Sequence, residues 1–365
     1  MKQFVVCLVL QFYLLNSVNC DWWETASFYQ IYPRSFKDNN NDGIGDLRGI
    51  AEKIDYLKDV GITATWLSPI YKSPNIDYGY DISDFCDIGE EYGTMADFDY
   101  LITRSKETGV KVIMDFVPNH TSDEHDWFQR SIKGEVPYSN YYIWNPGKVN
   151  SSNPSEMLPP SNWQSIGYAP GSAWTWNDER KAFYYHQFAV KQPDLNFREP
   201  KVHEEMLKVL KFWLDKGISG FRVDAITHMY ETVAINNVLP DEPLSNNSNN
   251  PNDYGYLNHI HTTDQNETFE LAYEWREFLD NYKTTNGGDT KILMTESYSA
   301  IEMVIRYYKD GNREGAQLPF NFELMKQLNN ESNAHDVVKA IYSWLDAMPE
   351  GHFTNWVVSF LTIVK

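Results

Sequence analysis

The sequence predicts an α/β fold organised around a parallel sheet. Short apolar or β-branched runs recur along the chain, and amphipathic segments with a helical spacing of apolar residues separate several of them. Gly61 and Gly109 directly follow two of these segments, as expected where a helix ends before the next strand. Strands that alternate with helices are typical of βαβ units, whose strands pair in parallel.

The individual elements follow from these patterns in chain order. Strands are expected at residues 27–32, 64–68, 111–117, 221–224, 291–296, 318–322 and 355–359. Helices are expected at residues 47–60, 95–108, 203–216, 269–281 and 335–346. A chain of 365 residues is long enough for one large domain with an insertion, or for two domains.

Two stretches interrupt the alternation. Residues 121–200 are rich in Trp, Tyr, Asn and Pro and lack helical periodicity. A structureless loop of this length is implausible in a compact domain, so the stretch predicts a small domain inserted after the third strand. Residues 237–258 are rich in Asn and predict an excursion at the rim of the sheet.

Residues 1–20 have the features of a secretory signal peptide. Lys2 precedes an apolar run that is too short to span a bilayer, and small residues before Cys20 suit cleavage. We therefore expect a secreted protein cleaved near Cys20, with an uncleaved anchor as the alternative. Sequons for N-linked glycans begin at Asn119, Asn150, Asn246, Asn266 and Asn330. All except Asn119, a poor glycan candidate, are expected on surface loops.

The composition limits the classes of partner. A formal net charge of −20 disfavours binding to nucleic-acid phosphates and to anionic membranes. An aromatic content of 15% suits sugars, because aromatic rings pack on the apolar faces of pyranoses. We expect neither a nucleic-acid partner nor an organic cofactor.

Charged side chains follow three consecutive predicted strands. The third strand ends in D-F-V-P-N-H at residues 115–120, the fourth in G-F-R-V-D at residues 220–224, and the fifth in T-E-S around Glu296. The carboxyl ends of parallel strands are where (β/α)₈ enzymes place their chemistry. We therefore expect these groups to converge on one pocket.

These segments resemble three of the four signature regions of the α-amylase clan. K-Q-P-D-L-N at residues 191–196 resembles the auxiliary region of its α-glucosidases and oligo-1,6-glucosidases. The resemblance implies a (β/α)₈ TIM barrel in two parts, residues 21–120 and 201–365, with inserted domain B at residues 121–200. It also implies a retaining α-glucosidase (maltase) that hydrolyses terminal non-reducing α-1,4-linked glucose from maltose, sucrose or short oligosaccharides.

The resemblance implies a role for each acid at a strand end. Asp224 matches the nucleophile and Glu296 the general acid/base, two groups that retaining glycosidases hold about 5–5.5 Å apart. Arg222 projects to the same face as Asp224, where it would keep the pKa of Asp224 low and contact substrate. Glu296 needs a raised pKa to be protonated near neutrality. Asp115 is expected to support the site near Arg222; a purely structural ion pair between Arg222 and Asp224 is the alternative.

Three further residues match sugar-binding positions of the family. His120 matches a histidine that hydrogen-bonds a hydroxyl of the non-reducing glucose. Asp77 and Tyr80 lie in the loop after the second strand, where the resemblance implies an Asp that binds hydroxyls and a Tyr that stacks on the ring. Ordinary loop packing is the alternative for Tyr80.

The loop of residues 38–46 carries oxygen side chains at alternate positions, which is how a chain wraps a hard cation. The resemblance implies a structural Ca²⁺ (or Mg²⁺) site, and a polar turn without metal is the alternative. The implied ligands are Asp38, Asn40, Asp42, Asp46 and the carbonyl O of Ile44.

The resemblance breaks after Val358. The fourth signature region reads approximately N-W-V-x-G-N-H-D in the family, and the chain matches it only at its start. Leu361 stands where the family has a substrate-binding His, and Thr362 where it has a third catalytic Asp. The eighth strand and the C-terminal β-sandwich are missing too, so we expect a truncated, weakly stable barrel with little activity.

Two alternatives to a hydrolase stay open. Amino-acid transporter heavy chains use an α-glucosidase-like ectodomain without catalysis, and a sugar-binding remnant would bind without turnover. The presence of Asp224 and Glu296 favours the enzyme, with an α-glucoside as substrate and no need for a transmembrane partner. The oligomeric state is not predicted.

Overall fold

A computed structural model of the chain describes residues 20–166, 171–236 and 238–358. Most of the predicted signal peptide, together with Leu361 and Thr362, lies outside the described residues. Over the residues that are described, none of the helices is both long and apolar enough to span a bilayer.

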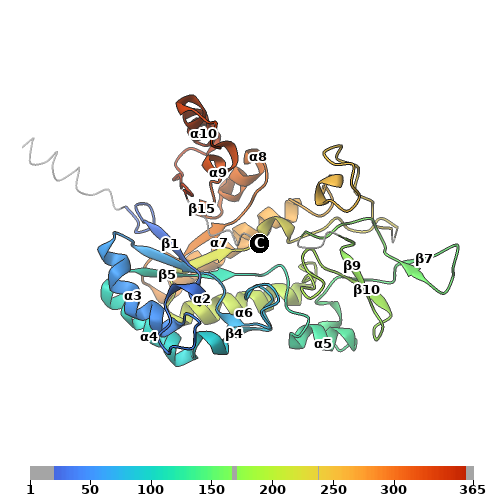
Figure 1. Ribbon diagram of the computed structural model, residues 1–365, viewed down its shortest axis with the longest axis horizontal. Helices are drawn as coiled ribbons and strands as arrows, with labels where there is room; N and C mark the ends of the chain where they lie inside the picture. Colours follow the sequence, from blue (N-terminus) through green and yellow to red (C-terminus); the bar gives the residue numbers. More distant parts are fainter. Residues whose placement is uncertain (1–19, 167–170, 237, 359–365) are drawn as a thin grey trace, which may run out of the picture.

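A six-stranded parallel sheet forms the centre of the described chain (Figure 1). In spatial order, its strands are β1 (Phe28–Ile31), β2 (Ala64–Leu67), β5 (Lys111–Phe116), β11 (Gly220–Val223), β12 (Ile292–Thr295) and β15 (Leu318–Pro319). The spatial order follows the chain order, and every neighbouring pair is parallel. Crossovers that all step in one direction build a (β/α)₈ barrel, whereas a doubly wound sheet reverses its order. The predicted barrel-type fold is confirmed over these strands.

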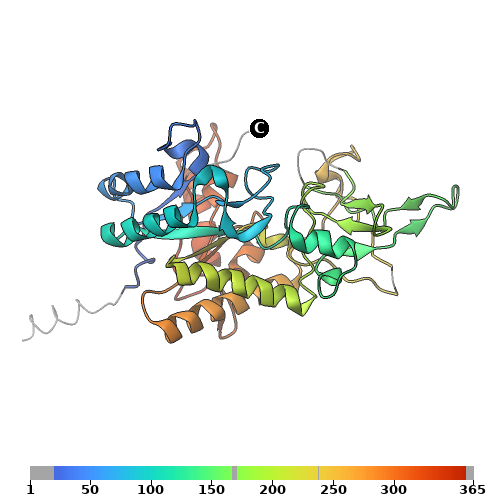
Figure 2. The ribbon, with the colours of Figure 1, turned by 90° about the horizontal axis from the view of Figure 1, so that it is seen from below.

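Amphipathic helices cover one side of this sheet (Figures 1 and 2). They are α3 (Leu47–Asp59), α4 (Met95–Thr108), α6 (Pro200–Lys216) and α7 (Asn266–Asn286). Their buried side chains form the larger apolar core with alternate strand residues such as Val112 and Met114. Trp213 of α6 is fully buried there and donates its indole N–H to the carbonyl O of Phe85 at 2.8 Å, so its polar atom is satisfied.

The opposite face of the sheet carries a second set of side chains. Ile113 and Met294 alternate with residues of the larger core and belong to a smaller apolar cluster with Trp66. Asp115 and Glu296 come two residues later on the same two segments and share this orientation. The strand period therefore brings charged groups to the inner face at the carboxyl ends of the strands.

The stretch after β5 has its own small sheet, seen at the right of Figure 1. Antiparallel strands pair there in the order β6–β10–β9, over Trp144–Asn145, Ala182–Tyr185 and Trp174–Asn177. Trp163 and Tyr185 lie in a local apolar cluster separate from the barrel core. The predicted limits of the insertion, residues 121 and 200, stay a prediction.

The remaining elements are short or lie toward the end of the described chain. The helices are α2 (Pro33–Phe36), α5 (Asp126–Ile132), α8 (Ile301–Val304), α9 (Glu323–Gln327) and α10 (Ala334–Ala347). The strands are β3 (Tyr71–Lys72), β4 (Asp84–Ile88), β7 (Lys148–Val149), β8 (Met157–Leu158), β13 (Lys309–Asp310) and β14 (Arg313–Glu314).

The strand predicted at residues 355–359 is wrong over the part that is described, because residues 355–358 form no strand. The side chain of Asn355, and not its backbone, bonds to the backbone next to it. It accepts from the Asn321 N–H at 3.0 Å and donates to the Pro319 carbonyl O at 2.6 Å. A backbone hydrogen bond of 3.4 Å from Val357 to Asn321 follows. The segment therefore lies beside β15 without extending the sheet.

Candidate active site

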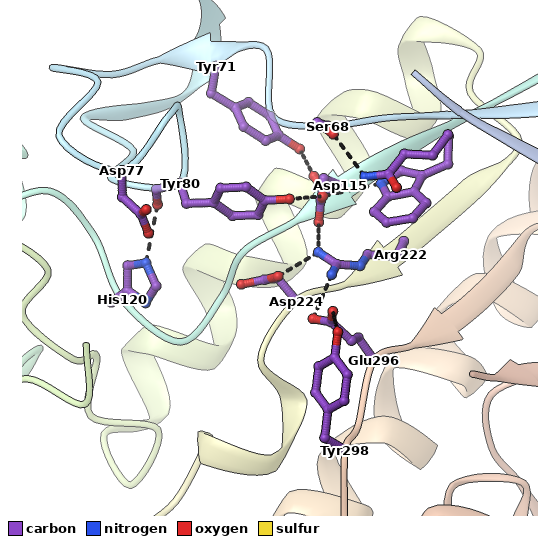
Figure 3. Close-up of polar contacts among 12 residues, drawn as sticks. Ser68, Tyr71, Asp77, Tyr80, Asp115, His120, Arg222, Asp224, Glu296 and Tyr298 are labelled. Carbon is purple, nitrogen blue, oxygen red and sulfur yellow. Dashed lines mark hydrogen bonds and ion pairs between the residues drawn. The ribbon is translucent and has the colours of Figure 1, made fainter. Parts of the chain in front are cut away.

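Arg222 is the centre of a buried charge cluster on the inner face of the sheet (Figure 3). The parallel register pairs it with Asp115 on β5, and its Nη1 lies 2.7 Å from Asp115 Oδ1. The same Nη1 lies 2.5 Å from Asp224 Oδ1, and Nη2 lies 2.5 Å from Glu296 Oε2. Only 2% of the Arg222 side chain is exposed, so one buried cation is shared by three carboxyl groups.

Hydrogen bonds fix both the carboxyl group and the backbone carbonyl of Asp115. Trp66 Nε1 and Tyr80 Oη both donate to its Oδ2, at 3.2 and 3.1 Å. Tyr71 Oη donates to the Asp115 backbone carbonyl, and the Arg222 guanidinium lies 4.6 Å from the Trp66 ring centroid. A carboxyl that is fully buried and bonded in this way orients its partner Arg222 and has no exposed oxygen of its own.

Asp224 and Glu296 form part of the wall of a cavity of about 890 Å³. Their side chains are 15% and 11% exposed, in contrast to the fully covered Asp115. Asp224 follows β11 directly, and Ala225 turns the chain away with a left-handed φ of 50°. The backbone N–H of Glu296 donates to the Val223 carbonyl O at 3.1 Å, which extends the β11–β12 pairing as far as the acid.

Burial sets the protonation of the two acids. Loss of water raises the pKa of Asp224 to about 6 and that of Glu296 to about 7, and Arg222 opposes both shifts. A hydrogen bond between the two carboxyl groups lowers the pKa of Asp224 and raises that of Glu296. The expectation of a low pKa for Asp224 is thus wrong, because desolvation outweighs the cation. The order remains Asp224 below Glu296.

A second polar cluster surrounds His120. Asn119 uses its side-chain NH₂ on Asp194, so its Oδ1 is left to accept from His120 Nδ1 at 2.9 Å. His120 Nε2 then accepts from Gln192 Nε2 at 3.0 Å, and the same Gln192 amide donates to Asp77 Oδ2 at 3.1 Å. Burial lowers the pKa of His120 to about 4, so the imidazole is neutral at physiological pH.

Tyr80 connects the two clusters (Figure 3). Its hydroxyl donates to Asp115, and its backbone carbonyl O lies 3.2 Å from His120 Nε2. The structure therefore brings Asp77, Tyr80 and His120 together beside the Arg222 cluster, as expected from the sequence.

The family described as alpha amylase, catalytic domain, matches residues 30–359 of this chain. The chain belongs to the α-amylase family. Maltase A2 of Drosophila melanogaster is 53% identical over 344 residues, which cover 94% of this chain and 60% of that protein. Salivary alpha-glucosidase of Anopheles gambiae is 50% identical over 339 residues, covering 93% and 56%. The family resemblance predicted from the signature segments is confirmed.

A solved structure shares the fold of this chain. The crystal structure of the alpha-glucosyl transfer enzyme XgtA matches with a TM-score of 0.81 at 34% identity, over 93% of this chain and 61% of that chain.

The amino acid transporter heavy chain SLC3A1 of Rattus norvegicus is 40% identical over 94% of this chain and 50% of its own length. Identity to the maltase is higher, so the transporter-like alternative is not favoured. The chain spans about 60% of the length of Maltase A2.

The predicted metal loop presents its oxygens to its own backbone. Asp38 accepts from the N–H groups of Asn41 and Gly43, and Asp42 accepts from that of Ile44. Asp46 caps α3 by accepting from Gly49 at 2.7 Å. Over the described residues, no three His, Cys, Asp or Glu side chains gather as a metal site. The α-amylase-family calcium site therefore stays a prediction about this loop.

Several partners of the predicted acids were not expected from the sequence. Trp66 and Tyr71 hold Asp115, Gln192 bridges Asp77 and His120, and Tyr298 donates to Glu296 Oε1 at 3.2 Å. A signal existed for two of them, because Gln192 lies inside the auxiliary motif and Tyr298 follows Glu296 by two residues.

Proposed function

We propose that this chain carries the catalytic centre of a retaining α-glucosidase. Its substrates would be maltose, sucrose or short oligosaccharides, from which it would release terminal non-reducing α-1,4-linked glucose. The observation that carries the proposal is that Asp224 and Glu296 share one buried guanidinium at the wall of a cavity of about 890 Å³. The names of the maltase and α-glucosidase relatives support the substrate class.

The proposed chemistry divides two carboxyl groups between two roles. Asp224 has one oxygen on Arg222, and its other oxygen would attack the anomeric carbon. Glu296, with the higher pKa, would protonate the glycosidic oxygen and later take a proton from water. Each acid lies 2.5 Å from the same guanidinium, and this closeness supports retention, because inverting enzymes separate the two carboxyl groups by about 6.5–9.5 Å to admit water.

The surrounding residues would bind and orient the sugar. We assign Arg222 to fixing both acids and contacting substrate, with Asp115 as its support. Asp77, Tyr80 and the neutral His120 would bind the non-reducing glucose. Because Nδ1 donates to Asn119, His120 could offer a sugar hydroxyl only its Nε2, as an acceptor. Because Gln192 joins Asp77 to His120, this subsite would act as one hydrogen-bonded unit.

Secretion and calcium belong to the same proposal. The salivary α-glucosidase relative supports an extracellular protein with the signal peptide removed near Cys20 and glycans on exposed sequons such as Asn246 and Asn330. Asn119 is only 2% exposed, which argues against a glycan there. Structural Ca²⁺ would bind the 38–46 loop.

Turnover of p-nitrophenyl α-glucoside tests the function. The wild-type protein should release p-nitrophenol, whereas Asp224→Asn should lower kcat by at least about 10³, because the nucleophile is lost. NMR of the first product should show the α-anomer of glucose. Binding of maltose by both proteins with turnover by neither would instead support a sugar-binding remnant.

A further inference from the structure

The two oxygens of Glu296 have different neighbours. Oε2 lies 2.5 Å from Arg222 Nη2, and Oε1 accepts from Tyr298 Oη at 3.2 Å. A guanidinium can only donate, so a proton on Glu296 cannot face Arg222. The proton must therefore be on Oε1, next to a hydroxyl that can either donate or accept.

Tyr298 is held in place by a separate contact. Its ring stacks on Phe322 with 4.6 Å between centroids and 2° between planes. Phe322 is 2% exposed and follows β15, so it provides a fixed base, while Tyr298 itself is 59% exposed and faces the cavity with Glu296. Figure 3 shows the phenol reaching the carboxyl from the side opposite Asp115.

We propose that Tyr298 is a positioning residue for Glu296. Its hydroxyl holds Oε1 toward the cavity, so that the oxygen carrying the proton faces the bond to be cleaved. The hydroxyl donates to a lone pair of Oε1, so that a proton on the same oxygen is left to face the glycosidic oxygen. The inference rests on the acid/base role proposed above for Glu296.

The Tyr298→Phe substitution distinguishes the role of the hydroxyl from that of the aromatic ring. The variant keeps the stack on Phe322 and loses only the hydrogen bond. The other charged or titratable groups that face Glu296 are Arg222, Asp224, Asp115 and Tyr80, and all are unchanged. Tyr298 lowers the pKa of Glu296, so its loss should move the basic limb of the kcat/KM profile to higher pH.

Two substrates show whether the acid step is affected. Maltose needs a proton on its leaving oxygen, whereas p-nitrophenolate leaves with little assistance. Tyr298→Phe should lower kcat on maltose about tenfold, with KM within about twofold, and lower kcat on p-nitrophenyl α-glucoside much less. Tyr298→Leu, which also loses the stack, serves as the control for general damage. Equal losses on both substrates with an unmoved basic limb would overturn the proposal, as would wild-type behaviour.

An infrared titration keeps the inference independent of turnover. The infrared band of the Glu296 carboxyl is identified as the band that is lost in Glu296→Gln. In Tyr298→Phe this band should titrate at higher pH than in the wild type. An unchanged titration overturns the positioning role. Equal maltose turnover by wild type and Glu296→Gln would instead overturn the proposed function while leaving the titration result intact.

Discussion

At the scale of single residues, the two acids at the cavity wall differ in the proton they hold. In the proposed reaction, Asp224, with a pKa of about 6, would attack in its ionised form, and Glu296, with a pKa of about 7, would act as an acid in its protonated form. We expect kcat/KM to rise as pH passes about 6 and to fall as it passes about 7. A pH profile of maltose hydrolysis checks this, because maltose needs the acid, and a flat profile from about pH 5 to 8 would contradict it.

The raised pKa of Glu296 also links folding to pH. A carboxyl whose pKa rises from 4.5 to about 7 on folding stabilises the protein below 4.5 and loses that contribution as pH rises through 7. Glu296→Gln should therefore show a smaller fall in unfolding free energy between those values than the wild type. Urea unfolding at both pH values measures the difference, and parallel curves would refute it.

Arg222 is the residue whose loss should be most damaging. Arg222→Gln leaves Asp115, Asp224 and Glu296 buried without their shared cation, which should destabilise the fold by about 3–5 kcal/mol at neutral pH. At acidic pH the carboxyl groups are protonated, and the loss should shrink. Denaturant midpoints at two pH values test this, with the surface variant Arg104→Gln as control. A loss independent of pH would show that packing, not charge, explains the effect.

At the scale of elements, the helix cap that Asp46 provides can be separated from the predicted metal site of its loop. It caps α3 through Gly49, so Asp46→Ala should cost about 1 kcal/mol in any buffer. If the 38–46 loop binds calcium, EDTA should lower the Tm of the wild type but not that of Asp42→Asn, whose position caps no helix. An unchanged wild-type Tm would argue against the metal.

The helix predicted at residues 95–108 agrees with the structure, whereas the strand predicted at residues 355–359 does not, and both outcomes have a physical reason. Thr94 caps α4 and Gly109 ends it with a left-handed φ, so local residues mark both limits and the prediction at 95–108 agrees with the structure. At residues 355–358 a side chain, Asn355, occupies the strand edge, and no local pattern shows this. Strand pairing depends on distant partners, whereas a cap depends on its neighbours.

In the candidate site, too, some features could be predicted from the sequence and others could not. Asp224 and Glu296 were found because each directly follows a strand within a short motif, and Arg222 because it belongs to the same motif as Asp224. Tyr298, which donates to Glu296, stacks on Phe322 from the segment after β15, so spacing alone does not reveal its position. Burial raises the pKa of Asp224, whereas a lowered pKa was expected. The sequence shows the nearby cation but not the loss of water.

At the scale of the whole molecule, α10 presents apolar side chains to solvent. Val338, Tyr342 and Leu345 recur at helical spacing and are 50%, 57% and 40% exposed. An exposed stripe of this kind promotes association. Val338→Lys with Tyr342→Lys should lower the apparent mass in light scattering at high protein concentration, whereas the charge control Asp346→Lys should not. An equal effect of both changes would attribute the association to net charge.

The charge balance around the shared guanidinium also predicts which sugar mimics should inhibit the proposed glucosidase activity. Three carboxyl groups face one cation, so the full ionised cluster has two unmatched negative charges, and one when Glu296 is protonated. A neutral sugar leaves this excess in place. A sugar mimic with a protonated ring nitrogen would neutralise it, and its affinity should increase with pH until the nitrogen itself loses its proton.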